Sequence, residues 1–119
     1  LMNDADFQFD YYRGYPAVVN HLNETNFLVQ VAANVPGVIE VEESPLQMGG
    51  EDFAYYLQHV KGTFFYTGAM PAQANNVYPH HHPKFDIDEK ALLIAAKTLC
   101  TAVIQYQKQS DLTKTELNV

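Results

Sequence analysis

The sequence predicts an α/β fold with helices packed on a sheet, and three observations support this prediction. After residue 23 the apolar residues alternate between helical spacing and short β-branched or aromatic runs. The resulting order is helix, strand, helix, strand, long loop and helix, which is typical of α/β domains. Glycine and proline lie between the runs, where turns are expected. The chain has 119 residues, 47% of them hydrophobic, which suits one domain with a core.

A separate strand is expected before this alternating unit. Phe7, Phe9 and Tyr11 recur at every second position, which is the period of a strand with one buried face. The run Gly14-Tyr15-Pro16 is expected to end this strand as a turn.

The first helix and the second strand follow directly. Asn23 is the expected N-cap of the helix, and Pro36-Gly37 is expected to stop it. The short apolar run from Val38 to Val41 predicts a strand. His21 lies just before the helix and is interpreted as structural or exposed.

The second helix is expected to open at Glu51 and to end at Gly62, with His59 inside it as a structural or exposed residue. Residues 63–67 are rich in aromatic side chains and predict a third strand. A long loop then runs from Gly68 to Phe85, and loops of this length are usually functional or disordered.

The last helix is expected after this loop. Asp86 and Glu89 have the spacing of a capping box, with Asp86 as N-cap. Cys100 falls within the apolar pattern of the helix and is expected to be a small buried residue. The polar residues from Lys108 onward are expected to fray, with 110–119 as a tail. The expected apolar stripe consists of Ala91, Leu92, Ala95, Ala96, Leu99, Ala102 and Val103.

Composition excludes several classes of protein. The net charge is −7 and the acids are spread along the chain, which argues against a nucleic-acid surface. The sequence holds no apolar run of about 18 residues that would span a membrane. A single cysteine cannot form an internal disulfide, which favours a reducing compartment and a cytoplasmic location.

The run Gly49-Gly50-Glu51-Asp52 is the first candidate site. Paired glycines let a backbone approach a ligand closely, and a helix start offers free N–H groups. A plain tight turn, with the two acids complementing the helix dipole, explains the same pattern. No phosphate-binding motif accompanies it.

The histidine cluster His80, His81 and His82 is the second candidate. Imidazole is the commonest metal ligand, but adjacent side chains point apart and zinc needs three or four ligands. Solvated loop histidines and a partial metal site both remain open on the pattern alone. Glu42-Glu43 has the composition of an acid–base pair, although a solvated strand end is the favoured explanation.

Three motifs in order carry a resemblance to a known family. The runs GGEDFAYY, TFFYTGA and HHHPKFDIDEKAL, preceded by YRGYPAVVNH, resemble the C-terminal part of dinuclear metallo-aminoacylases and carboxypeptidases. The similarity is to the branch of N-acyl-amino-acid amidohydrolases and auxin-conjugate hydrolases. It covers nearly all of the chain, and the combination of motifs is far more specific than any one of them.

The resemblance implies a fold and a division into domains. It implies the C-terminal half of a zinc-peptidase-like catalytic domain, with helices packed on a sheet. A terminal strand of the inserted lid (dimerisation) domain would precede it. Residues 1–16 would end the lid, residues 17–109 would belong to the catalytic domain, and residues 110–119 would form the polar tail.

The resemblance also implies site residues. Enzymes of this family hydrolyse an amide bond with two metal ions and a bridging water. Their last metal ligand, two residues before the proline of a His-x-Pro motif, corresponds to His81. Gly49, Gly50 and Glu51 would line the substrate pocket, with Asp52 bracing the loop.

The resemblance therefore implies a fragment of a metal-dependent amidohydrolase acting on N-acyl amino acids or small peptides. Zinc is the expected metal, with manganese, cobalt and nickel as alternatives. The family's general base and other metal ligands have no matching motif here, so the chain alone is expected to be inactive. The parent is expected to be a homodimer. The alternative is a non-catalytic α/β interaction domain.

Overall fold

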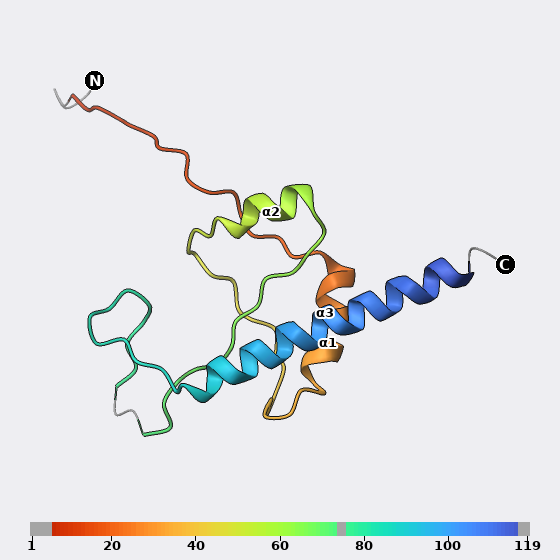
Figure 1. Cartoon of the computed structure of the whole chain (residues 1–119). Coiled ribbons are helices and arrows are strands. Elements are labelled where there is room, and N and C mark those ends of the chain that lie inside the picture. Colours follow the sequence, from red (N-terminus) through yellow and green to blue (C-terminus); the bar gives the residue numbers. More distant parts are fainter. Residues whose placement is uncertain (1–5, 74–75, 117–119) are drawn as a thin grey trace.

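The computed structural model describes residues 6–73 and 76–116. Within these ranges the chain forms the three helices α1 (Leu22–Ala32), α2 (Phe53–His59) and α3 (Lys90–Glu116), joined by long irregular segments (Figure 1). All three lie where the helical spacing and the breakers Pro36, Gly37 and Gly62 predict them. The helix predictions are therefore confirmed in position, though not at each boundary.

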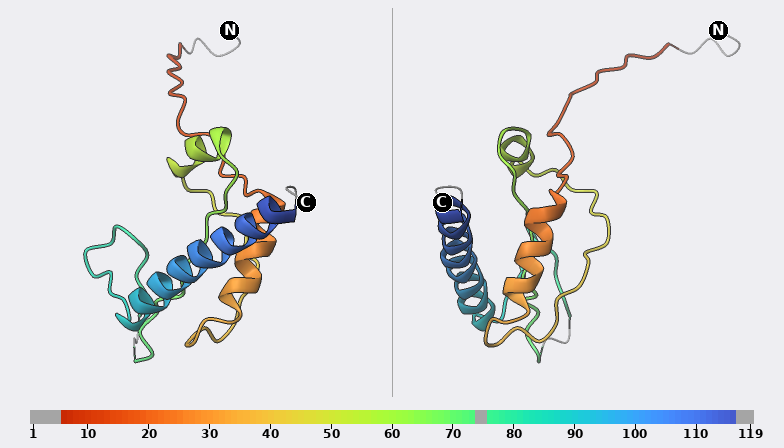
Figure 2. Two further views of the ribbon diagram at one scale, coloured as in Figure 1. Left: turned by 45° about the vertical axis from the view of Figure 1, so that its right-hand side comes forward. Right: turned by 90° about the vertical axis from the view of Figure 1, so that its right-hand side faces the viewer.

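The helices that pack against each other are α1 and α3, which lie close together in Figure 2. Phe27 of α1 meets Tyr106 of α3 edge to face, with ring centroids 5.8 Å apart. At the C-terminal end of α1, Gly37 has a φ of 102° and lies against the side chain of Ile94. A side chain at Gly37 would meet Ile94 Cγ1 at 3.3 Å, so this turn needs glycine for both its dihedral angle and its space. Among the residues whose burial is described, those that are buried are Val31, Val35, Ala54, Leu57, Ala91 and Thr98.

The expected sheet is not confirmed. In the described residues no segment is paired as a strand, including residues 7–12, 38–41 and 63–67. A strand exists only when its backbone pairs with a neighbour, and the backbone near residue 63 has other partners. The side-chain amide of Asn20 donates to the carbonyl of Phe64 at 2.8 Å and accepts from its N–H at 2.7 Å.

The molecule is thin and extended. Its radius of gyration is 20.5 Å and its dimensions are 77 × 46 × 19 Å, whereas a compact domain of this length has a radius of gyration of about 13 Å. The segment before α1 reaches away from the helices in Figures 1 and 2. As a result, many large apolar side chains lie on the surface, for example those of Phe7, Tyr12 and Ile39.

Helix α3 differs from its expected pattern. Ala91 is buried, but Leu92, Leu99 and Val103 of the expected stripe are more than half exposed. Cys100, expected to be buried, is exposed. The helix is apolar on several sides, and α1 covers only one of them. The helix also continues to Glu116, so the expected fraying is not seen over 108–116; residues 117–119 are outside the described part.

Two of the expected caps are also wrong. Helix α1 begins one residue before Asn23, with His21 at its N-cap and no capping hydrogen bond from a side chain. Before α3, the carboxylate of Asp88 accepts the N–H of Lys90 at 3.0 Å, whereas that of Asp86 accepts the N–H of its neighbour Ile87 at 2.9 Å. In both helices the first turn begins at a residue other than the best capping candidate in the sequence. A different residue therefore lies at the helix start.

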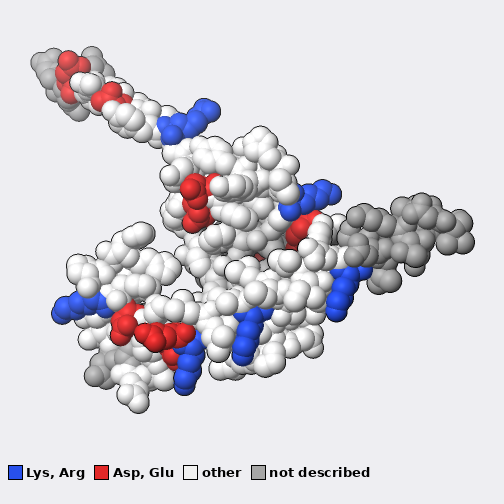
Figure 3. Space-filling model, in the orientation of Figure 1, with Lys and Arg blue, Asp and Glu red and all other residues white. Residues whose placement is uncertain are grey.

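Charge is scattered over the surface. On the face drawn in Figure 3, basic and acidic side chains are interspersed over the described part of the molecule. No helix within the described ranges combines the length and apolar character needed to cross a membrane.

Candidate functional site

The loop that leads into α3 carries the three histidines. We call residues 78–85 the histidine loop. Its backbone makes two successive turns: the N–H of His82 donates to the carbonyl of Pro79 at 3.2 Å, and the N–H of Phe85 donates to the carbonyl of His82 at 2.9 Å. Within the first of these turns, His81 has a φ of 68°. This is the left-handed region, which non-glycine residues seldom occupy.

His82 and His80 are held by neighbouring aromatic rings. The ring of His82 stacks on Tyr78 with centroids 4.4 Å apart and planes 13° from parallel. Its Nδ1 accepts the backbone N–H of Lys84 at 3.0 Å, which assigns the ring proton of neutral His82 to Nε2. His80 meets Phe85 edge to face at 5.0 Å. The chain on both sides of His81 is therefore fixed by side-chain contacts.

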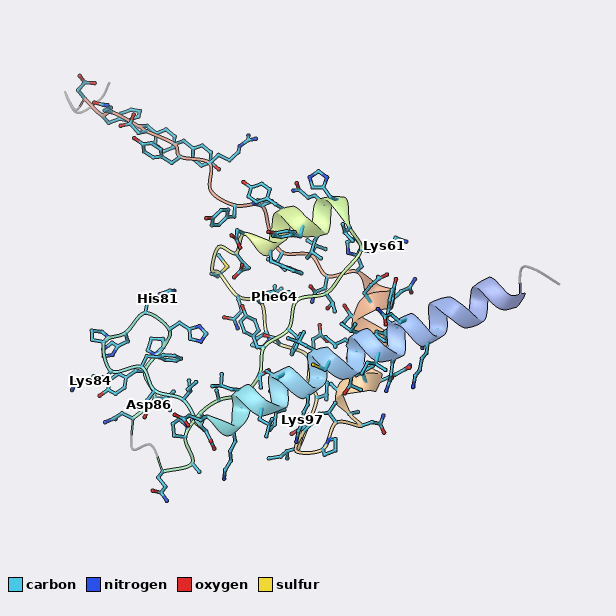
Figure 4. The ribbon with its side chains drawn as sticks, viewed as in Figure 1. Lys61, Phe64, His81, Lys84, Asp86 and Lys97 are labelled. Atoms are coloured by element: carbon cyan, nitrogen blue, oxygen red, sulfur yellow. The ribbon has the colours of Figure 1, made fainter. Side chains whose placement is uncertain are left out.

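His81 itself is exposed. Within the described part of the chain, its ring takes part in no hydrogen bond or aromatic contact. Figure 4 shows it at the outer end of the loop, away from Lys97 on α3. Of the three histidines it is the one whose ring has neither a hydrogen bond nor an aromatic partner within the described part. The metal role of His81 stays a prediction, and no group of three or more potential metal ligands occurs among the described residues.

The loop before α2 carries the other candidate residues. A side chain at Gly50 would lie 3.2 Å from Cδ2 of Tyr15, so this glycine makes room for an aromatic ring. Tyr15 in turn meets Tyr55 of α2 edge to face at 5.9 Å. Gly49 has open space around it. The substrate role of this loop also stays a prediction.

The two acids before α2 make different contacts. One carboxylate oxygen of Glu51 accepts the N–H of Phe53 at 3.2 Å and so braces the start of α2. Asp52 is at the N-cap position, but it is exposed and its side chain makes no capping bond. Its backbone is already helical there, with φ −71° and ψ −17°, so its side chain is not placed to cap. The bracing expected of Asp52 is therefore made by Glu51, and the substrate role of Glu51 stays a prediction.

The structure does not bring the two loops together. Figure 1 draws the loop before α2 and the histidine loop as separate excursions. A shallow apolar depression of about 190 Å³ lies on α2, lined by Tyr55, Tyr56, His59 and Val60. None of the predicted site residues lines it. The described part of the chain thus presents two separate elements of a site.

A set of hydrogen bonds that the sequence did not predict links residues 20–25 to residues 62–64. Besides the two bonds of Asn20, the N–H of His21 donates to the carbonyl of Gly62 at 3.0 Å, and the N–H of Gly62 donates to Nδ1 of His21 at 3.2 Å. The hydroxyls of Thr25 and Thr63 are 3.0 Å apart. The structural interpretation of His21 is confirmed. The signal was present in the Asn-His pair that ends YRGYPAVVNH, two side chains able to bond to backbone.

Comparison with known proteins gives one consistent family. The model of the peptidase family M20/M25/M40 matches residues 5–105. A Bacillus subtilis protein named "Putative amidohydrolase YhaA" is 61% identical over 107 residues, which cover 90% of this chain and 27% of that protein. The N-acetylcysteine deacetylase of the same organism is 33% identical over 94 residues, 78% of this chain and 23% of its own length. Other relatives have the names carboxypeptidase and IAA-amino acid hydrolase.

A solved structure supports the same assignment. The crystal structure of a "putative aminohydrolase" from methicillin-resistant Staphylococcus aureus matches with a TM-score of 0.70 at 40% sequence identity. The match covers 77% of this chain and 23% of that one. The chain spans about a quarter of the length of the relatives it matches. The family model covers most of the chain, and the family suggested by the glycine and histidine motifs is confirmed: this chain belongs to peptidase family M20/M25/M40.

Proposed function

We propose that this chain is the C-terminal part of a metal-dependent amidohydrolase or peptidase. The parent enzyme hydrolyses the amide bond of N-acyl amino acids or small peptides, using water activated by metal. The observation that carries the proposal is the 61% identity over 107 residues to a protein named as an amidohydrolase. The relative named as a deacetylase of an N-acylated amino acid supports the substrate class.

The donor chemistry of the histidine loop fits one ligand of a metal site. The ring of His81 is exposed and has neither a hydrogen bond nor an aromatic partner within the described part, and a neutral imidazole suits zinc, manganese, cobalt or nickel. A divalent ion, when bound, supplies Lewis-acid chemistry by lowering the pKa of water and polarising the substrate carbonyl. Since the described residues contain no cluster of three potential ligands, the remaining ligands must come from elsewhere. The chain alone is therefore expected to be inactive.

The role of the chain is to position groups around that chemistry. His81 holds one ion of the pair, while the backbone of Gly49 and Gly50 and the side chain of Glu51 line the substrate pocket. Tyr15, packed over Gly50 and against Tyr55, keeps the glycine backbone in place. The bond from the Glu51 carboxylate to the Phe53 N–H limits this side chain to a supporting contact unless substrate displaces it.

The proposal includes an organisation of the parent. Residues 1–16 end a lid domain through which the parent forms a homodimer. Residues 17–109 belong to the catalytic domain, and residues 110–119 follow it. The single cysteine suits a reducing cytoplasm.

The test is metal content and amide hydrolysis of the full-length parent carrying His81→Ala. We expect the variant to lose one equivalent of metal and nearly all activity. His59→Ala is the matched control, because His59 is also exposed but lies at the end of α2. Full metal content and full activity in His81→Ala would refute the ligand assignment. A parent with neither metal nor hydrolysis would favour the non-catalytic interaction domain.

A further inference from the structure

The backbone of His81 has an unusual conformation. At φ 68° His81 is, within the described residues, the one non-glycine residue with a positive φ. A left-handed residue is strained and persists only when its surroundings hold it. His81 is exposed, and its own ring takes part in no hydrogen bond or aromatic contact within the described part. The holding force must therefore come from its neighbours.

Two contacts hold His82, the residue that follows His81. The first is the stack of His82 on Tyr78, with centroids 4.4 Å apart, which ties the chain back across His81. The second is the bond from the Lys84 N–H to Nδ1 of His82 at 3.0 Å, which fixes the rotation of the imidazole. The amine of Lys84 also lies 5.9 Å from the centre of the Tyr78 ring.

A third contact acts on the residue before His81. His80 packs edge to face on Phe85 at 5.0 Å. The two ring pairs cross the loop in sequence, with 78 on 82 and 80 on 85, and both enclose position 81. His80 and His82, which the sequence offers as further metal ligands, therefore pack against aromatic rings.

We propose that Tyr78 and His82 are positioning residues that hold His81 in its left-handed conformation and aim its imidazole outward as a metal ligand. This inference rests on the proposed function, because it takes His81 to be the ligand. The family match shows membership and assigns no role to Tyr78 or His82. Residues that orient a ligand commonly change metal affinity by about 10- to 100-fold when they are replaced.

The experiment separates the ring from the hydrogen bond in the full-length parent. Tyr78→Phe keeps the stack and should behave as wild type, whereas Tyr78→Leu removes it. His82→Phe keeps the stack but loses the acceptor, and His82→Asn keeps an acceptor for the N–H two residues ahead but loses the stack. We expect zinc affinity, measured by chelator competition, to fall about tenfold or more in Tyr78→Leu and in His82→Asn, which both lose the stack, and less in His82→Phe.

A second readout needs no metal. Trypsin can cut after Lys84, inside the histidine loop, and we expect faster cutting there in metal-free Tyr78→Leu than in wild type. Tyr12→Leu is the matched control, since Tyr12 is exposed and its ring pairs with no other ring in the described part. Tyr78→Phe should restore both the affinity and the slow cutting.

The outcomes distinguish this inference from the proposal on which it rests. If His81→Ala keeps all its metal, the ligand assignment fails, and so does the presentation of a ligand. If His81→Ala loses metal while Tyr78→Leu keeps wild-type affinity and wild-type cutting, the ligand stands and the positioning role is overturned. Loss of affinity in Tyr78→Leu with rescue in Tyr78→Phe supports the inference.

Discussion

Contacts between residues far apart in the sequence hold α1 against α3, whereas contacts between near neighbours in the sequence hold the histidine loop. In the helix pair, Phe27 meets Tyr106 and Gly37 meets Ile94, partners that are far apart in the sequence. In the histidine loop the contacts between side chains join residues no more than six apart, such as His80 and Phe85 or Lys84 and Tyr78. The helix pair therefore depends on the whole chain folding, whereas the loop conformation is encoded locally. Damage to the core should lower global stability, and damage to the loop should stay local.

The largest effect on stability is expected from Val31→Ala. Val31 of α1 is 1% exposed, and shortening it leaves a cavity. We expect the free energy of unfolding of the parent to fall by about 2 kcal/mol, measured with denaturant. Val29→Ala in the same helix is the control, because Val29 is 44% exposed and should cost much less. Equal losses would show that the helix pair is not a core.

An intermediate effect is expected from Gly37→Ala. Alanine is strained at a φ of 102°, and its Cβ would lie 3.3 Å from Ile94 Cγ1. We expect a loss of about 1 kcal/mol or more, seen as a lower thermal midpoint. Gly68→Ala is the control, because nothing lies within 4 Å of a Cβ there. If both variants melt together, the turn after α1 does not depend on glycine.

The smallest effect is expected from Lys84→Ala. The change removes an exposed cation near Tyr78, worth about 0.5 kcal/mol, and leaves the backbone N–H that bonds to His82. The thermal midpoint of the parent should not move measurably. Lys97→Ala on α3 serves as the surface control. A shift as large as that of Gly37→Ala would mean that the loop is coupled to the core, and the contrast between the two regions would fail.

Sequence patterns predicted where the helices lie more reliably than which residues contact one another. The spacing of apolar residues placed all three helices, and the motif around His81 placed the candidate ligand. The caps were less predictable, because Asp86 and Asp88 both suit the start of α3. The carbonyl of Ala69 accepts the Asp88 N–H, and this contact with a distant part of the chain selects between them. Glu51 and Asp52 present the same ambiguity at α2, and backbone angles resolve it.

The sequence by itself determined the family, the helices and the three histidines beside a proline before α3. These features depend on residue type and spacing along the chain, which the sequence contains in full. The tertiary structure decided which side of α3 is covered, so that Thr98 is buried and Cys100 is exposed. It also decided that the backbone of Phe64 pairs with the amide of Asn20, where a strand partner was expected. Burial and strand pairing both depend on what lies opposite in space, and a one-dimensional pattern does not contain that information.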